Sequence, residues 1–219
     1  MLVPDIDRRE RTAADIRSLR EDLVGSLSAL RSEQWEVDSL CKGWTVREVV
    51  VHLIRLETYL RAPLRYAVAV VANGFRPNRY QELDVRRFAS VEPSELVRSL
   101  AEAKYEESWF WRRHPWPEMT VAELVIHGQD VRRPLGLQHQ ISIDQLGLVA
   151  DVIVRRVPRV FRYPLGGWLL PNVRFEASDA SWSWGSGPTI RGPLEAIVMT
   201  LAGRRQAATD LSGDVSLVS

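Results

Sequence analysis

The stretch TVREVVVHLIRLETYL (residues 45–60), together with TVAELVIHGQDV (residues 120–131), decides the fold. In each stretch a threonine precedes a glutamate by three residues, a spacing that predicts a capping box at a helix N-terminus. Apolar residues then recur at spacings of three and four, which is typical of a helix with a buried face. The sequence therefore predicts two buried helices, one beginning at Thr45 and the other at Thr120.

The segments around these two helices have mostly helical patterns as well. Apolar residues recur with helical spacing over residues 5–35, 93–113 and 143–157. Pro63 is expected to kink or split the helix that begins at Thr45, because proline lacks a backbone N–H. Residues 75–91 are polar, and we expect them to be irregular. The prediction is a mainly α protein with a bundle of four to five helices.

The character of the chain changes after about residue 163. Val173, Phe175 and Ala177 alternate with polar residues, as in a half-buried strand. Pro193 has the position of a first-turn proline in a helix that Gly203 closes. The sequence thus predicts a helical bundle over residues 1–163 and a small α/β C-terminal lobe over residues 164–219.

Charge and composition narrow the class of protein. The 219 residues carry 29 basic and 28 acidic side chains, a net charge of +1, which disfavours nucleic acid as a partner. The apolar runs are far shorter than the roughly 20 residues of a membrane span, and the first residues lack a signal-peptide pattern. Cys41 is the single cysteine, so no internal disulfide forms. We expect a cytoplasmic protein that binds neither nucleic acid nor membrane.

Three side chains in the two helices suggest a metal site. His52 lies on an apolar helix face, and Glu123 and His127, four residues apart, share a face of the other helix. A core histidine and an intrahelical Glu–His pair are the alternatives. An ionised glutamate in a core is costly unless it is paired or bound to metal. Two imidazoles and a carboxylate suit Zn²⁺, with Ni²⁺ or Fe²⁺ as alternatives, and three protein ligands leave positions open for catalysis.

Three runs of sequence resemble one known family. They are SLCKGWTVREVVVHL (residues 39–53), ELVIHGQD (residues 123–130) and GPLEAIVMTLAGR (residues 192–204), the last followed by DLSG. In this order they resemble the mycothiol-dependent maleylpyruvate isomerase family of actinobacteria, within the DinB-like metalloenzyme superfamily. The resemblance implies a DinB-like helical bundle whose metal ligands correspond to His52, Glu123 and His127.

The resemblance also implies a function. It predicts a metal-dependent isomerase or S-transferase that uses mycothiol, a low-molecular-weight thiol, on a small electrophilic and anionic substrate. A metal ion stabilises a thiolate and so activates the thiol sulfur. Arg204, in the third run, is the candidate catalytic residue, since a guanidinium binds a carboxylate through two hydrogen bonds. The alternatives are a metal-dependent hydrolase or cyclase using the same site, and a non-catalytic metal- or ligand-binding protein.

Overall fold

The structure is a computed structural model that describes residues 3–114, 116–138, 140–156 and 172–218. Its internal contacts divide the chain into two compact units, Met1–Gln138 and His139–Ser219. The boundary expected near Pro164 lies outside the described residues. The helix expected over residues 143–157 belongs to the second unit, although the sequence placed it in the bundle.

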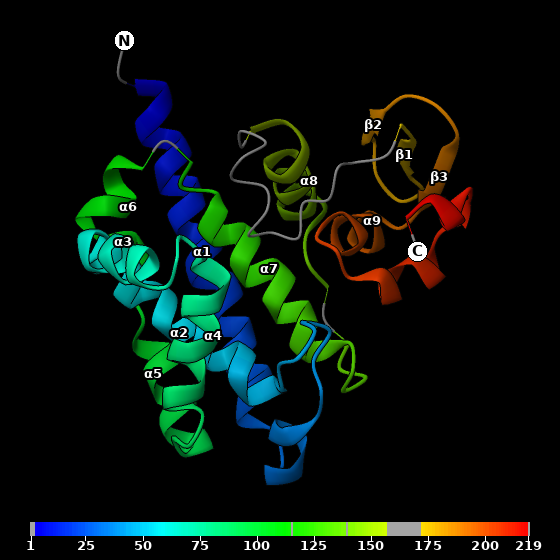
Figure 1. Cartoon of the computed structure of the whole chain (residues 1–219). Helices are drawn as coiled ribbons and strands as arrows, with labels where there is room; N and C mark the ends of the chain where they lie inside the picture. The colour runs from blue at the N-terminus through cyan, green and yellow to red at the C-terminus, as the bar shows by residue number, and fades with distance from the viewer. Residues whose placement is uncertain (1–2, 115, 139, 157–171, 219) are drawn as a thin grey trace. The chain divides into compact units, whose positions relative to one another are not determined.

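The first unit is a bundle of helices, as predicted. Its elements are α1 (Val3–Ser28), α2 (Val46–Arg61), α3 (Pro63–Ala72), α4 (Pro77–Phe88), α5 (Pro93–Glu102), α6 (Trp109–Arg113) and α7 (Met119–Arg132), with 3₁₀ turns at Ser32–Glu36 and Tyr105–Glu107. α1 packs against α5 and α7, and α2 packs against the same two helices (Figure 1). Leu23, Leu53, Leu100 and Leu124 are buried, one from each of these four helices. The core of the unit therefore lies between α1, α2, α5 and α7.

The start of α2 follows the predicted capping box. The Thr45 hydroxyl accepts a hydrogen bond from the Glu48 backbone N–H at 3.3 Å, and the Glu48 carboxylate accepts one from the Thr45 N–H at 2.9 Å. Pro63 splits the longer predicted helix into α2 and α3, because its ring is compatible with a first helical turn but not with a helix interior. The cap fixes which α2 side chains point into the bundle.

The start of α7 differs from the prediction. The helix begins at Met119, its N-cap residue is Glu118, and no side chain caps it. Thr120 therefore lies inside the first turn, and the predicted capping box at Thr120 is wrong. The reason is the direction of the Glu123 side chain, which points to two histidines rather than back to the helix start.

Residues 75–91 also differ from the prediction, because most of them form α4. The buried face of this helix includes Asp84, which is only 4% exposed. Its carboxylate accepts hydrogen bonds from Arg55 Nε at 2.7 Å and from the Tyr59 hydroxyl at 2.8 Å, both on α2. A charged residue at a core position hides the apolar periodicity by which helices are recognised. The expectation of an irregular segment was therefore wrong.

The second unit is a small α/β lobe, as predicted. Its elements are α8 (Ile143–Asp151), a π turn (Val152–Arg156), β1 (Arg174–Ala177), β2 (Ser183–Gly185), β3 (Thr189–Gly192), α9 (Leu194–Leu201), β4 (Ser212–Gly213), and 3₁₀ turns at Arg205–Asp210 and Val215–Leu217. The strand order is β2-β1-β3-β4, with β1 parallel to β3 and the other pairs antiparallel. α9 packs on β1 and β3, and α8 packs on α9. Gly203 closes α9 with a φ of 85°, a conformation that glycine adopts readily.

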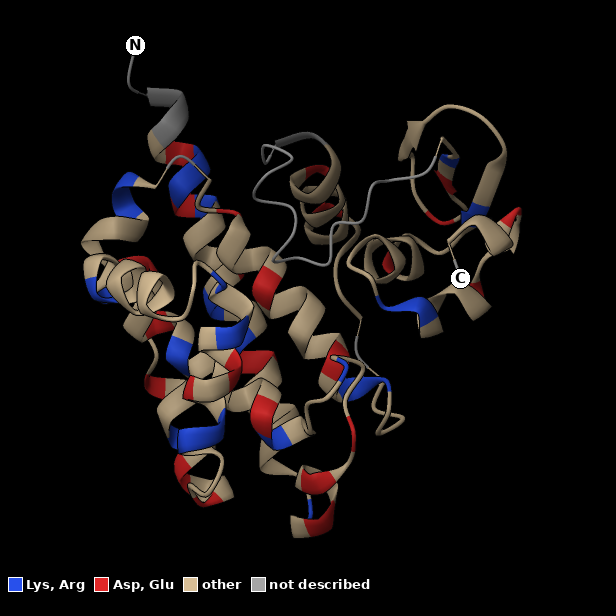
Figure 2. Cartoon of the chain, viewed as in Figure 1, with Lys and Arg blue, Asp and Glu red and all other residues tan. Residues whose placement is uncertain are grey.

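Acidic and basic residues are interspersed along the helices of the first unit (Figure 2). This agrees with the near-balance of charges in the sequence. In the part of the chain that the structure describes, no helix combines the length and the apolar character needed to cross a membrane.

Candidate metal centre

His52, Glu123 and His127 meet inside the first unit. Glu123 Oε2 lies 3.3 Å from His52 Nε2 and 3.2 Å from His127 Nε2. One ligand atom from each residue lies within 4.8 Å of the other two. The His52 side chain is 5% exposed, the His127 side chain 11% and the Glu123 side chain 16%. The structure therefore brings together the three residues that the sequence singled out.

The packing of α2 against α7 creates this arrangement. His52 follows the Thr45 cap by seven residues, or about two helical turns, and its flanking residues Val51 and Leu53 are buried. On α7, a spacing of four residues stacks Glu123 and His127 on one face. Two helices thus present three polar side chains to one point inside the first unit.

The charges at this point are strongly coupled. Burial by itself would raise the pKa of Glu123, but hydrogen bonds from His127 and His52 outweigh it and hold this pKa well below its usual range. Burial would likewise lower the pKa of His127, but hydrogen bonds to Asp130 and Glu123 raise it above the ordinary imidazole value. Glu123 is therefore a carboxylate at neutral pH, which is the form that binds a cation.

Asp130 orients one of the histidines. Its carboxylate accepts a hydrogen bond from His127 Nδ1 at 2.8 Å, and the residue is fully buried. Its backbone carbonyl accepts a hydrogen bond from the Leu40 N–H at 3.1 Å, which ties α7 to the loop before α2. With a proton held on Nδ1, loss of the second proton from His127 would leave the Nε2 lone pair directed toward Glu123 and His52 for a metal ion.

Trp44 also borders the site, and it was not among the residues predicted for it. Its ring centroid lies 5.1 Å from that of His52 and 6.4 Å from that of His127, and the second pair is stacked with an interplanar angle of 26°. The two imidazole rings are themselves 4.8 Å apart. The signal that could have found Trp44 is its position directly before the Thr45 cap, which fixes it beside the start of α2.

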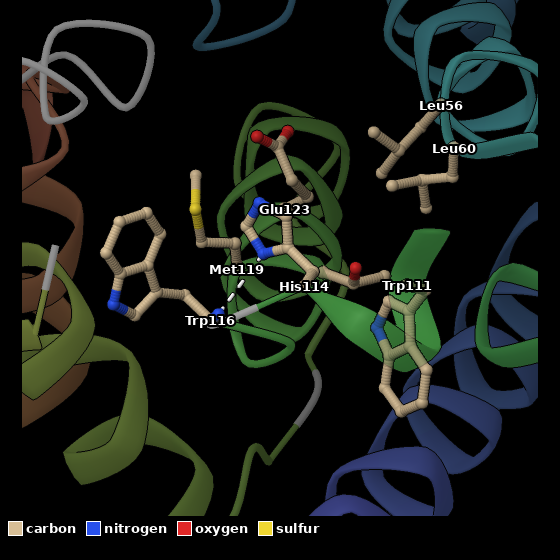
Figure 3. A pocket seen from close by; sticks show the side chains of 8 residues that line it. Leu56, Leu60, Trp111, His114, Trp116, Met119 and Glu123 are labelled. Carbon is tan, nitrogen blue, oxygen red and sulfur yellow. Dashed lines mark hydrogen bonds between the residues drawn. The ribbon is translucent and has the colours of Figure 1, made fainter. Parts of the chain in front are cut away.

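A small cavity adjoins the site on the side of Glu123. Its volume is about 110 Å³, and Glu123 forms part of its wall (Figure 3). The other described residues that line it are Leu56, Leu60, Trp111, His114, Trp116, Met119 and Thr120. The carboxylate thus faces the two histidines and also borders a largely apolar space.

The three side chains fit a divalent metal of borderline softness. Two imidazole nitrogens and one carboxylate oxygen form a set found in catalytic zinc sites, and such a set leaves coordination positions for other ligands. The atoms already converge, and the Asp130–His127 hydrogen bond supplies the outer support that metal-bound histidines usually have. His52, Glu123 and His127 are therefore the residues that would hold the ion.

The other candidate residues belong to the second unit or have a simpler explanation. Arg204 belongs to the second unit, where it is 9% exposed and donates a hydrogen bond to the Ala202 carbonyl at 2.6 Å. The Cys41 sulfur, a His127 nitrogen and an Asp130 oxygen also lie within 4.8 Å of one another. Since the hydrogen bond between His127 and Asp130 explains the proximity of those two, this group gives no separate argument for a metal.

The fold and the site together define a class of helical-bundle proteins, those of DinB-like fold with histidines and a carboxylate converging between two helices. Within this class, the family described as "Mycothiol maleylpyruvate isomerase N-terminal domain" matches residues 16–132. Because the match covers more than half of the chain, the chain belongs to this family. The resemblance noted in the sequence is thereby confirmed.

Relatives and solved structures extend the match over most of the chain. An uncharacterised protein of Mycobacterium tuberculosis strain H37Rv and its counterpart in strain CDC 1551 are each 23% identical, over 90% of this chain and 86% of theirs. A crystal structure of a His-to-Ala mutant of mycothiol-dependent maleylpyruvate isomerase matches with a TM-score of 0.60 at 15% identity, covering 94% of this chain and 92% of that one. A second structure of that isomerase gives 0.52 at 15% identity, covering 90% and 89%. At this identity the structures show a shared fold.

Proposed function

We propose that this protein is a metal-dependent, mycothiol-using isomerase or S-transferase that acts on a small electrophile. The observation that carries the proposal is the convergence of His52, Glu123 and His127 in a chain of the mycothiol maleylpyruvate isomerase family. We propose Zn²⁺ as the metal, with Ni²⁺ or Fe²⁺ as alternatives, because the donor set is two nitrogens and one oxygen. The described part of the chain thus supplies the residues for one reactive centre.

A divalent metal held by these residues supplies Lewis acidity, which lowers the pKa of a thiol and makes its sulfur nucleophilic at neutral pH. The protein's own groups prepare that centre. Glu123 brings the negative charge, Asp130 fixes the orientation of His127, and the Trp44 ring covers part of the two imidazoles. The buried position of the histidines limits access of water, which strengthens electrostatic interactions there.

Addition of mycothiol to the cobalt-substituted protein should produce a sulfur-to-cobalt charge-transfer band. The reason is that three protein ligands leave a position that a thiolate sulfur can take. The measurement is an absorption titration with mycothiol, and the matched control is the same titration with the disulfide form, which has no free thiol. A mycothiol titration without this band, on protein that carries a full equivalent of cobalt, would show that the open positions serve another ligand, such as water in a hydrolase.

We further propose that Arg204 binds the carboxylate of an anionic substrate. Replacement by lysine keeps the charge but removes the paired donors of the guanidinium, so the variant Arg204→Lys should bind maleate about tenfold more weakly. Isothermal titration of the zinc-loaded protein measures this. Arg205→Lys is the matched control, because Arg205 is the neighbouring arginine and is exposed. Equal weakening in both variants, or none in either, would remove Arg204 from the site.

A further inference from the structure

The cavity beside Glu123 is formed within the first unit from three elements and one connection. Leu56 and Leu60 come from α2, and Trp111 comes from α6. His114 and Trp116 follow α6, and Met119, Thr120 and Glu123 come from the first turns of α7. Figure 3 shows Leu56 and Leu60 on one side and Met119 and Trp116 on the other. None of the described residues that line the cavity is a lysine or an arginine.

We propose that this cavity is the specificity pocket for the electrophilic substrate, and that it takes a compact, uncharged, branched aliphatic group such as isobutyl. The inference rests on the proposed function, and it adds the chemical class of the group that the site selects. Because Glu123 forms part of the cavity wall, a group bound in the cavity lies next to the residues that would hold the metal.

The volume of the cavity sets the size of the group. A protein cavity of about 150 Å³ lined by aliphatic and aromatic side chains stays dry and binds benzene. The present cavity, at about 110 Å³, is smaller and has leucine, methionine and tryptophan side chains in its wall. It therefore fits a group of three or four carbons better than a ring or a sugar. The polar cysteinyl-sugar of mycothiol does not suit such a wall.

The composition of the wall sets the character of the group. Most of the described lining residues are leucine, methionine and tryptophan, and none is a lysine or an arginine. A carboxylate placed in the cavity would lose its hydration without gaining a cationic partner among these residues. An uncharged group avoids that cost. The second carboxylate of a dicarboxylate such as maleylpyruvate is therefore a poor occupant of this pocket.

His114 supplies one polar contact that can orient the group. Its Nδ1 accepts a hydrogen bond from the Trp116 backbone N–H at 3.2 Å, so the proton of the neutral imidazole is on Nε2. Burial lowers the pKa of His114, which keeps the ring neutral at pH 7. In Figure 3 the Nδ1 edge meets Trp116 and the other ring nitrogen lies toward the side of the Glu123 carboxylate. An N–H donor in the wall suits a carbonyl oxygen next to the aliphatic group.

Two unreactive amides of the same shape test the proposal on the zinc-loaded full chain. Isovaleramide carries an isopropyl group where malonamide carries a second amide, so the two differ in polarity and hardly in size. We expect saturable binding of isovaleramide by ligand-detected NMR, and at least about tenfold weaker binding of malonamide, because its amide would lose water without gaining partners. Equal affinity for the two amides, or no binding of isovaleramide, would overturn the proposal.

Substitutions of the lining residues test whether isovaleramide binds in the cavity. Leu60→Trp fills the space and should weaken isovaleramide binding by about tenfold or more, and Leu56→Phe does the same with less bulk if the first variant fails to fold. Leu64→Trp is the matched control on the exposed surface of α3, where the side chain is 77% exposed. His114→Leu should weaken binding, and His114→Gln, which keeps an N–H donor near the position of Nε2, should restore it. Equal affinity in Leu60→Trp and in Leu64→Trp would place the amide elsewhere.

This experiment is independent of thiol chemistry. Isovaleramide contains no electrophilic double bond, so its binding reports the pocket even if mycothiol is not the cosubstrate. Conversely, a cobalt–sulfur band with mycothiol together with no selective amide binding would keep the proposed function and reject the pocket. The two proposals thus fail on different measurements.

Discussion

Replacing His52 with alanine should reduce the zinc content of the purified protein from about one equivalent per chain to less than about a tenth. His52 is the only ligand that α2 contributes to the proposed centre among the described residues, and its Nε2 lies 3.3 Å from Glu123. Without it, two ligands from one helix remain, and a pair of that kind binds zinc much more weakly than a set of three. Metal analysis after dialysis against a weak chelator measures the effect.

Metal analysis should also distinguish a residue that supports the metal ligands from a residue that does not contribute to the centre. Asp130→Asn keeps the size of the side chain but removes the carboxylate that accepts the His127 hydrogen bond, so zinc affinity should fall by about 10- to 100-fold. His114→Leu is the matched control, because it removes a histidine of the same unit that is not in the ligand cluster. It should retain a full equivalent of zinc. Zinc retained by His52→Ala, or lost equally by His114→Leu, would contradict the proposed ligand set.

The metal centre could be predicted from sequence because it depends on local spacing. The Thr45–Glu48 cap fixes the start of α2, and a histidine seven residues later then falls on a face whose neighbours are apolar. Glu123 and His127 share a face through their spacing alone. What spacing does not give is the packing of α2 against α7, and for that step the resemblance to a known family was needed. The sequence thus specified the donors but not their meeting point.

Other parts of the site depend on tertiary contacts that leave no pattern in the sequence. The Trp44 ring lies beside two histidines that are 8 and 83 residues further along the chain. The cavity likewise combines α2 with the connection between α6 and α7. The capping box predicted at Thr120 was also wrong. Thr120 and Glu123 have the spacing of a capping box, but α7 does not use them as one. A glutamate recruited to a site is not available for the local role that its spacing suggests.

The helix α4 was not predicted from the sequence for a similar reason. Most of its residues are polar, and Asp84 occupies a position where an apolar side chain would reveal the buried face. The partners that make this burial possible, Arg55 and Tyr59, lie 25 or more residues earlier on α2. Helical periodicity records burial of apolar groups, so it does not detect a helix held by a buried charge. Elsewhere in the bundle most core positions are apolar, and helices were predicted there, although the one expected over residues 93–113 is divided into α5, a 3₁₀ turn and α6.

Replacing Asp84 with alanine should therefore lower the free energy of unfolding by about 3 kcal/mol, because it leaves a guanidinium and a phenol in a largely buried place without their acceptor. Arg55 Nε donates to Asp84 at 2.7 Å, and its guanidinium also lies 4.4 Å from the centre of the Phe88 ring. Burial and the hydrogen bond to Asp84 raise the pKa of Tyr59 well above its usual value, so the phenol stays protonated and donates. Urea unfolding measures the loss.

Glu82→Ala is the matched control for this prediction, since it removes an acidic residue of the same helix whose ion pair is exposed. The Glu82 carboxylate lies 2.7 Å from Arg86, but both side chains are about half exposed, and such pairs stabilise a protein by less than about 0.5 kcal/mol. Asp84→Asn, which keeps one acceptor oxygen, should fall between the two. A loss in Asp84→Ala no larger than in Glu82→Ala would mean that water or other groups replace the carboxylate, and that α4 is held by its apolar contacts instead.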